Sequence, residues 1–171
     1  MFQFCPNCKS DKLTFNNNHY WTCSNCDFLY YHNIAASVAG IIACDNKILL
    51  TKRAKAPSRG LLDLPGGFVD PNETLEQALS REVYEELGIQ IQDWHYLASF
   101  PNIYTYKNTR YNTIDTFFYT QIKLAPAITL ETSEVSSAHW LSITDFQIEE
   151  LSFLSIQQAI QHYKKSVYDQ K

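Results

Sequence analysis

The sequence contains no apolar run that approaches the ~18 residues needed for a helix to cross a membrane. Its N-terminus also lacks the basic, apolar and small-residue regions of a secretory signal peptide. These absences argue against a helical membrane protein and give no support for secretion. We therefore expect a cytoplasmic protein, a setting in which cysteines stay reduced.

An excess of basic residues is also missing. The chain has 14 lysines and arginines but 18 aspartates and glutamates, a formal net charge of −4. Such a chain has no bulk attraction for nucleic acid or for an anionic membrane. Internal repeats and low-complexity tracts are absent as well. With 171 residues, 45% of them apolar, the sequence predicts one ordinary domain and a small appendage.

Four of the five cysteines form two C-x2-C pairs, Cys5–Cys8 and Cys23–Cys26, with residues 9–22 between them. Each pair can direct two thiolates at one ion, and the two pairs together complete the tetrahedron that zinc prefers. Disulfides are the competing interpretation, but they need an oxidising compartment. A redox C-x-x-C would not need a second matched pair. We expect a closed, structural zinc site that uses all four cysteines.

The segment around these cysteines is too short to fold on a hydrophobic core, so the metal should fold it. Residues 13–15 and 19–22 read as two strands of a hairpin, joined by the asparagine turn at residues 16–18. The sequence predicts a zinc ribbon over residues 1–31 and a main domain over residues 32–171. The aromatic residues of the ribbon could stack nucleobases, but few cations accompany them, so we expect them to cover its surface.

A helix of about 13 residues is predicted from Leu75 to Leu87. Thr74 is a suitable N-cap, Gln77 completes a capping box, and Gly88 is a natural C-terminal stop. An apolar stripe repeats along one face of this helix and should pack on a core. Its members are Leu75, Leu79, Val83 and Leu87.

Three carboxylates, Glu82, Glu85 and Glu86, crowd the C-terminal half of the same helix. Like charges three or four residues apart repel, and the last turn of a helix disfavours anions. A solvated acidic face is the ordinary explanation, but a hard divalent cation would convert the repulsion into ligation by oxygen atoms. Arg81 offers a cationic partner either for Glu73 or for Glu82.

The segment from Gly67 to Ile89 resembles the Nudix box, the family pattern G-x5-E-x7-R-E-U-x-E-E-x-G-U, in which U is aliphatic. The resemblance implies a pyrophosphohydrolase that uses Mg²⁺ or Mn²⁺ to split a nucleoside diphosphate linked to another moiety, X. It also implies an α/β/α sandwich with a mixed sheet. The nine specified positions are all met, by Gly67, Glu73, Arg81, Glu82, Val83, Glu85, Glu86, Gly88 and Ile89.

The rest of the main domain reads as strands, helix, strands, helix, the order expected of the Nudix sandwich, although composition alone supports only α/β or α+β. The first strand is apolar enough to be buried on both faces. An aromatic-rich turn is expected at residues 101–108. Strands are expected at residues 34–44, 48–51, 94–100, 110–123 and 138–143, and a second helix at residues 153–163.

By resemblance, the three box glutamates hold magnesium, and the carbonyl oxygen of Gly67 joins them. Arg81 and Glu73 match family residues that frequently pair with each other. The general base stays open, because members of the family differ. It is either a box glutamate, Glu82 or Glu85, or Glu134 in the loop before Trp140.

Candidate substrate-binding residues lie outside the box. Arg53 ends a strand within a basic run and could hold phosphates. Phe100, Tyr104 and Tyr106 could stack a base, although packing in the core or in a loop suits them equally.

A zinc ribbon ahead of a Nudix domain is also similar to the NADH pyrophosphatases, which carry a downstream Ser-Gln-Pro-Trp motif. Here the corresponding residues are Ser99, Phe100, Pro101 and Asn102, so Gln and Trp are lost. We therefore rank a compound similar to ADP-ribose above NADH. NADH or NAD hydrolysis, a non-catalytic ligand sensor and an RNA-binding protein are the alternatives. The expected partner is a small nucleotide, not a membrane or nucleic acid, and a homodimer stays open.

Overall fold

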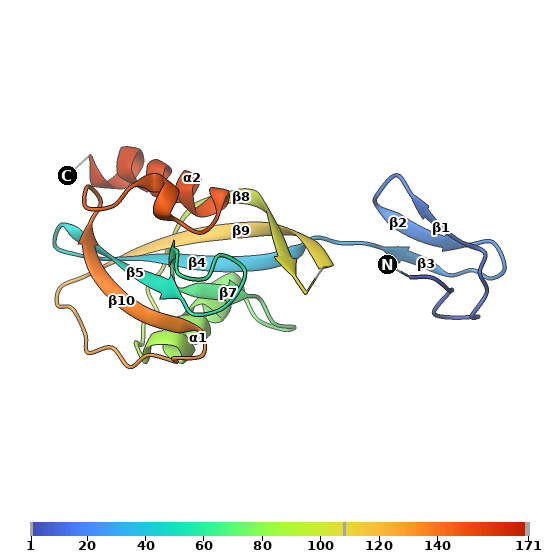
Figure 1. Ribbon diagram of the computed structural model, residues 1–171, viewed down its shortest axis with the longest axis horizontal. Helices are drawn as coiled ribbons and strands as arrows, with labels where there is room; N and C mark the ends of the chain where they lie inside the picture. Colours follow the sequence, from blue (N-terminus) through green and yellow to red (C-terminus); the bar gives the residue numbers. More distant parts are fainter. Residues whose placement is uncertain (1, 108, 170–171) are drawn as a thin grey trace. The chain divides into compact units, whose positions relative to one another are not determined.

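The computed structural model describes residues 2–107 and 109–169 (Figure 1). The chain divides into two compact units, Met1–Ile34 and Ala35–Lys171. This division falls three residues after the boundary that the sequence predicts between residues 31 and 32. The functional assignment of the two segments stays a prediction.

The first unit is built on a three-stranded antiparallel sheet in the order β1-β2-β3. The predicted hairpin is confirmed as β1 (Leu13–Asn16) and β2 (Tyr20–Cys23), and β3 (Leu29–Tyr31) is an additional strand. Trp21 stacks on Phe15 with ring centroids 4.6 Å apart and contacts the edge of Phe2. Trp21 is buried together with Cys5 and Cys23, so the cysteines belong to the small core of this unit.

The second unit contains a seven-stranded mixed sheet, whose main path runs β10-β5-β4-β9-β8. Strands β4 and β9 are parallel, and the other pairs are antiparallel. A 3₁₀ turn, η1 (Ile148–Glu150), precedes α2, and a π-helical segment, η2 (Lys164–Tyr168), continues it. The strands are β4 (Ala35–Cys44), β5 (Lys47–Arg53), β6 (Leu62–Asp63), β7 (Gly66–Phe68), β8 (His95–Tyr106), β9 (Thr109–Ile122) and β10 (Val135–Ser142), and the helices are α1 (Leu75–Leu87) and α2 (Leu154–Tyr163).

The two helices cover opposite faces of this sheet, α1 on one and α2 on the other (Figure 1). Side chains of β4 alternate between the faces, as the period of a strand requires. Ile41 and Ala43 lie in the core beneath α2, whereas Val38 and Ile42 lie in the core beneath α1. The α/β/α sandwich and the doubly buried first strand are therefore both confirmed.

Helix α1 begins and ends at the predicted residues. The Thr74 hydroxyl accepts a hydrogen bond from the Gln77 backbone, and the Gln77 side chain accepts one from the Thr74 backbone. Gly88 ends the helix with a left-handed φ of 69°, which glycine adopts without strain. Within residues 2–107 and 109–169, no helix is long and apolar enough to cross a membrane.

The turn predicted at residues 101–108 is wrong in its position. Strand β8 continues through Pro101 to Tyr106 and forms a long hairpin with β9. Because β8 is an edge strand, it pairs on one side only, and an edge position tolerates the missing N–H of proline. The aromatic residues that were assigned to a turn therefore lie on an extended strand.

Candidate active site

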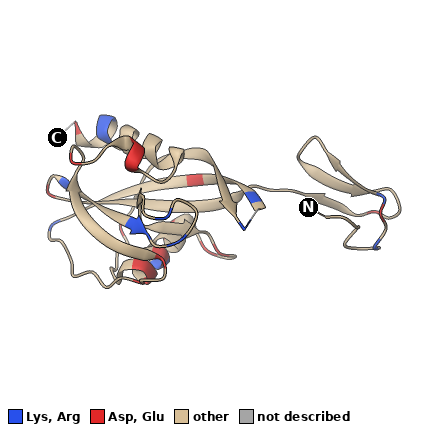
Figure 2. Cartoon of the chain, viewed as in Figure 1, with Lys and Arg blue, Asp and Glu red and all other residues tan. Residues whose placement is uncertain are grey.

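A cavity of about 460 Å³ opens in the second unit, beside β7 and α1. It is lined by residues from both halves of the sheet and from α1. Residues from the loop before β10 and from the start of α2 complete the lining. Figure 2 shows acidic residues in red on α1. Eight carboxylate residues line the cavity, against two cationic ones. The acidic residues are Asp63, Asp70, Glu82, Glu85, Glu86, Asp115, Glu131 and Glu134, and the cationic ones are Arg53 and Lys55.

The backbone of β7 lies directly against the carboxylates of α1. A Cβ atom on Gly67 would lie 2.5 Å from the carboxylate carbon of Glu82, so a side chain at this position would displace Glu82. Next to it, the Gly66 N–H donates to Glu86 at 3.2 Å. The structure therefore brings Gly67, Glu82 and Glu86 together at one end of the cavity.

Burial makes these carboxylates hard to ionise. Loss of solvent, and then the neighbouring Asp63 carboxylate, raise the pKa of Glu86 to about 8. Burial also raises the pKa of Glu82, against the opposing effect of Arg81. Clustered carboxylate oxygens of this kind suit a hard divalent cation, which would favour their ionised form.

Arg81 connects three glutamates of the box. It donates to both oxygens of Glu73, at 2.7 and 2.9 Å, to Glu82 at 2.8 Å and to Glu85 at 3.2 Å. These hydrogen bonds from Arg81 lower the pKa of Glu73. The two pairings that the sequence offered as alternatives are thus both present, and Arg81 fixes the orientation of Glu82.

Glu134 reaches the same cavity from the loop before β10. Its backbone carbonyl accepts a hydrogen bond from the Ala54 N–H at 2.8 Å, and its carboxylate forms an ion pair with Lys55. Its charge contributes to the raised pKa of both Glu82 and Glu86. The structure therefore brings Glu134 near the box, and its function as general base stays a prediction.

Of the four predicted substrate-binding residues, Arg53 and Tyr104 line the cavity. The Arg53 guanidinium lies 5.2 Å from the centre of the Phe153 ring and forms an ion pair with Asp63 at 2.6 Å. Tyr104 contacts Phe153 and Phe68, with ring centroids 5.9 and 5.5 Å apart. Phe153, Tyr104 and Phe68 form an aromatic wall.

Phe100 and Tyr106 are not among the residues that line the cavity. Phe100 packs toward the core, 6.1 Å from Phe117, whereas Tyr106 is exposed near the hairpin turn. Both share the strand face of Tyr104, but two residues along a strand correspond to about 6.7 Å. Tyr106 is therefore one such step beyond Tyr104 on β8, and Phe100 is two steps before it.

Several cavity residues were not predicted from the sequence. Asp115 carries a usable signal, because it is a charged residue inside an otherwise apolar strand. Asp63 also lies between leucines, just before the glycine turn. Phe153 gives no signal, because only the return of the chain at α2 brings it to Tyr104.

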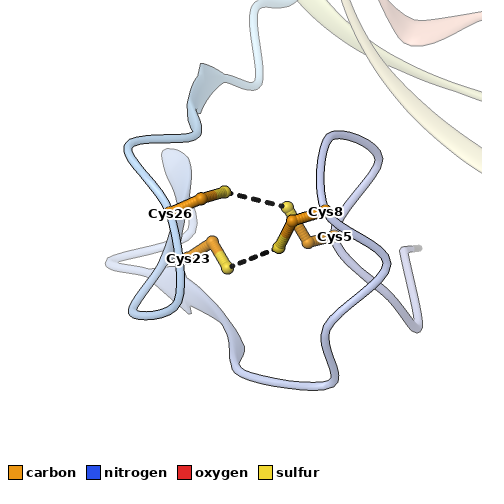
Figure 3. Close-up of side chains that lie close together, drawn as sticks. All are labelled: Cys5, Cys8, Cys23 and Cys26. Carbon is orange, nitrogen blue, oxygen red and sulfur yellow. Dashed lines mark hydrogen bonds between the residues drawn. The ribbon is translucent and has the colours of Figure 1, made fainter.

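The four predicted cysteine ligands converge in the first unit (Figure 3). The sulfur atoms of Cys5 and Cys26 lie 3.7 Å apart, as do those of Cys8 and Cys23, and all four lie within 4.8 Å of one another. Ligands ~2.3 Å from a tetrahedral ion are about 3.8 Å apart, so the set fits zinc. The cysteines are free rather than disulfide-bonded.

Amide groups surround these sulfur atoms. The Asn25 side chain donates to Cys8 at 3.6 Å, and the Asn7 side chain donates to Cys26 at 3.6 Å. Hydrogen bonds from the Ser10 backbone and then from Asn25 lower the pKa of Cys8 to about 6. Such donors favour the thiolate, which is the form that binds metal. Despite the Asn7 donor, burial and the sulfur atoms of Cys8 and Cys5 raise the pKa of Cys26 to about 11.

In the part of the chain that the structure describes, no other group of three or more metal-ligating side chains brings its ligand atoms this close. The box glutamates are instead drawn partly toward Arg81. The two candidate metal sites therefore differ in how far their ligands are assembled before a metal binds.

The second unit is thus an α/β/α sandwich with a carboxylate-lined cavity beside its acidic helix, α1. A family model described as the NUDIX domain matches residues 32–161. The chain therefore belongs to the Nudix family, and it carries an N-terminal four-cysteine cluster compatible with a zinc ribbon.

Curated relatives differ in the part of the chain that they match. The NAD-capped RNA hydrolase NudC of Vibrio atlanticus (strain LGP32) is 31% identical over 142 residues, which are 83% of this chain and 50% of that protein. The ADP-ribose pyrophosphatase of Methanocaldococcus jannaschii is 54% identical over 61 residues, 36% of each chain. The chain thus spans half or less of the length of these two relatives.

Among solved structures, a Nudix hydrolase from Nitrosomonas europaea is similar over nearly the whole chain. The match covers 98% of this chain and 93% of that one, with a TM-score of 0.74 and 24% identity. At this level of identity the similarity establishes the fold.

Proposed function

We propose that the chain is a divalent-metal-dependent Nudix pyrophosphohydrolase that cleaves the diphosphate linkage of a nucleoside diphosphate–X compound. The observation that supports this most directly is the acid-rich cavity. A diphosphate is itself an anion, so eight carboxylates around it would repel it unless cations intervene. The products would be a nucleoside monophosphate and phosphorylated X.

Each residue of the site has an expected task. Glu82, Glu85 and Glu86, with the Gly67 carbonyl oxygen, would hold Mg²⁺ or Mn²⁺, and bound ions of this kind neutralise phosphoryl oxygens and acidify water. Arg81 holds Glu82 in position. The attacking water gives a proton to the general base, which is either Glu134 or a box glutamate, Glu82 or Glu85. Arg53 orients the diphosphate.

We rank a compound similar to ADP-ribose first as the substrate. The aromatic wall offers a surface on which an adenine ring could stack. The 54% identity with a protein named ADP-ribose pyrophosphatase supports this ranking, although it covers only 61 residues.

NADH or NAD hydrolysis is the second candidate. It is favoured by the match to the Vibrio NudC, which extends over 83% of this chain. The name of that relative also raises NAD-capped RNA as a substrate, against which the net charge of −4 argues. The motif's Gln and Trp are replaced here by Phe100 and Asn102, which argues against NADH as the substrate.

We further propose that Cys5, Cys8, Cys23 and Cys26 bind one structural Zn²⁺. The spacing of the sulfur atoms and the surrounding amide donors support this assignment. All four coordination positions come from the protein, so this ion would have no open position for catalysis.

The test is a hydrolysis screen with product analysis, using ADP-ribose, NADH, FAD, nucleotide sugars, dinucleoside polyphosphates and nucleoside triphosphates. We expect Mg²⁺-dependent release of AMP from ADP-ribose, faster than from NADH. Release of inorganic pyrophosphate from a nucleoside triphosphate would refute the ranking, and no turnover of any compound would refute the activity.

A further inference from the structure

Asp115 on β9 is a buried carboxylate whose hydrogen-bond partners are neutral. Its Oδ1 atom accepts hydrogen bonds from the hydroxyls of Ser37 and Thr113, the latter at 2.7 Å. Its Oδ2 atom accepts from the Asn102 amide at 2.8 Å and from the Ser155 hydroxyl at 2.6 Å. A carboxylate offers about four acceptor positions, so these partners occupy them. Asp115 therefore holds its neighbours in place and has no acceptor left for a ligand.

One of these neighbours, Asn102, lines the cavity with a fixed amide. Its nitrogen donates to Asp115, and its oxygen accepts the backbone N–H of Ile103 at 2.8 Å. An ionised carboxylate cannot donate and a backbone N–H cannot accept, so exchanging the two ends of the amide would break both hydrogen bonds. One N–H and one oxygen lone pair of Asn102 stay available for a ligand.

The aromatic wall lies beside this amide. Tyr104 follows Asn102 by two residues on β8 and also lines the cavity, and Phe153 contacts Tyr104 with centroids 5.9 Å apart. Ring faces bind any base by stacking, whereas a neighbouring donor and acceptor select among base edges. An aromatic wall next to the fixed Asn102 amide is therefore suited to one base rather than to all.

An asparagine amide complements adenine, which presents an N–H donor beside a ring-nitrogen acceptor. Hypoxanthine differs by an oxygen in place of the exocyclic amino group, so its edge offers two acceptors, or an acceptor and a donor in reversed order. A reversed order is matched only by a reversed amide, which Asp115 and the Ile103 N–H prevent.

We infer that Asn102 is a specificity-determining residue that hydrogen-bonds the edge of the substrate's adenine, and that Asp115 is a positioning residue that fixes its amide. This inference rests on the proposed hydrolysis of an adenine nucleotide. The Asn102 position is also the one at which the chain departs from the tryptophan of the similar NADH pyrophosphatases.

The experiment compares ADP-ribose with inosine diphosphate ribose, both as substrates and as ligands. Wild-type kcat/KM should favour the adenine compound about tenfold or more. Asn102→Leu should reduce this ratio to about twofold, mainly through KM. Asn112→Leu, an exposed asparagine on the neighbouring strand that does not line the cavity, is the matched control and should keep the wild-type ratio.

Asp115→Asn tests whether Asp115 positions the Asn102 amide or only supports the fold. Its amide can both donate and accept, so of the two contacts that fix the Asn102 amide only the Ile103 N–H still favours one orientation. We expect the base preference to weaken severalfold while kcat on both compounds is retained. An equal loss of kcat on both compounds with an unchanged ratio would show that Asp115 supports the fold only.

Calorimetric titration of the Glu86→Gln variant measures binding of the two compounds without hydrolysis, so it tests the inference independently of turnover. Adenine-selective binding without hydrolysis by the wild type would overturn the proposed function and support the inference. Equal binding and equal hydrolysis of both compounds would overturn the inference and leave the function standing. Binding of neither compound by the variant, together with hydrolysis of neither by the wild type, would overturn both.

Discussion

The two units of this chain use charged and metal-ligating residues in opposite ways. In the first, four sulfur atoms lie within 4.8 Å of one another, close to the spacing that a tetrahedral zinc ion requires, so the ligands are assembled for an ion. In the second, burial raises the pKa of Glu86, and Glu82 and Glu85 are bound to Arg81.

We expect this difference to separate a metal that maintains a fold from a metal that is used in turnover. The first unit has a small core in which two of the cysteines are themselves buried, so we expect its stability to depend on a bound ion. The second has apolar cores on both faces of its sheet and tolerates a cluster of carboxylates at one end. The predictions below test this contrast, beginning with the largest effect.

Loss of the zinc ligands should unfold the first unit alone. In Cys23→Ser, we expect amide protection to disappear from residues 2–34 while the second unit keeps its melting temperature. Zinc binding contributes about 10–16 kcal/mol in comparable small domains, far more than this core can supply. Hydrogen exchange and elemental analysis measure the two effects.

Cys44→Ala is the control for this experiment, because Cys44 is a buried cysteine of β4 outside the cluster. It should retain about one zinc per chain after gel filtration. A wild-type protein with no zinc and four readily titrated thiols in its native state would refute the structural metal site.

Glu86→Gln should lower kcat by about a thousandfold or more, because it removes an expected ligand of the catalytic metal. The melting temperature of the metal-free protein should stay the same or rise, since a buried carboxylate is replaced by a neutral amide that can still accept the Gly66 N–H. Steady-state kinetics at saturating Mg²⁺ and thermal denaturation provide the measurements.

Glu76→Gln is the matched control on the same helix, because Glu76 is exposed in the first turn of α1 and does not line the cavity. It should leave kcat unchanged. If Glu86→Gln turns over at the wild-type rate, Glu86 is not a metal ligand.

Gly67→Ala tests whether the close approach of β7 to α1 matters for turnover. The added methyl group would meet the Glu82 carboxylate, so either the carboxylate or the strand must move. A displacement of about 1 Å at a catalytic group lowers activity on the order of a hundredfold. We expect that loss in kcat together with a higher Mg²⁺ requirement. A variant that matches the wild type in both would show that the approach can relax without consequence.

Local signals allowed the sequence to predict much of this structure. The caps at Thr74 and Gly88 and the apolar stripe of α1 each depend on residues a few positions apart, and the cysteine spacing defines its own cluster. Pro101 misled the prediction, because whether a proline interrupts a strand depends on the strand's place at the edge of the sheet. Cavity residues such as Asp115 and Phe153 meet through contacts between distant segments, so no local pattern predicts their proximity.

Tyr104→Ala should have the smallest effect, and it compares two positions on one strand rather than two units. Stacking of a base on an aromatic ring contributes about 1–3 kcal/mol, so KM should rise roughly tenfold. The contact is retained in the ground state and in the transition state, so kcat should change little. Tyr106→Ala, two residues toward the hairpin turn and outside the cavity, should raise KM by less. Steady-state kinetics with ADP-ribose measures both variants. An equal or larger effect at Tyr106 would place the base along the hairpin instead of against the wall of Phe68, Tyr104 and Phe153.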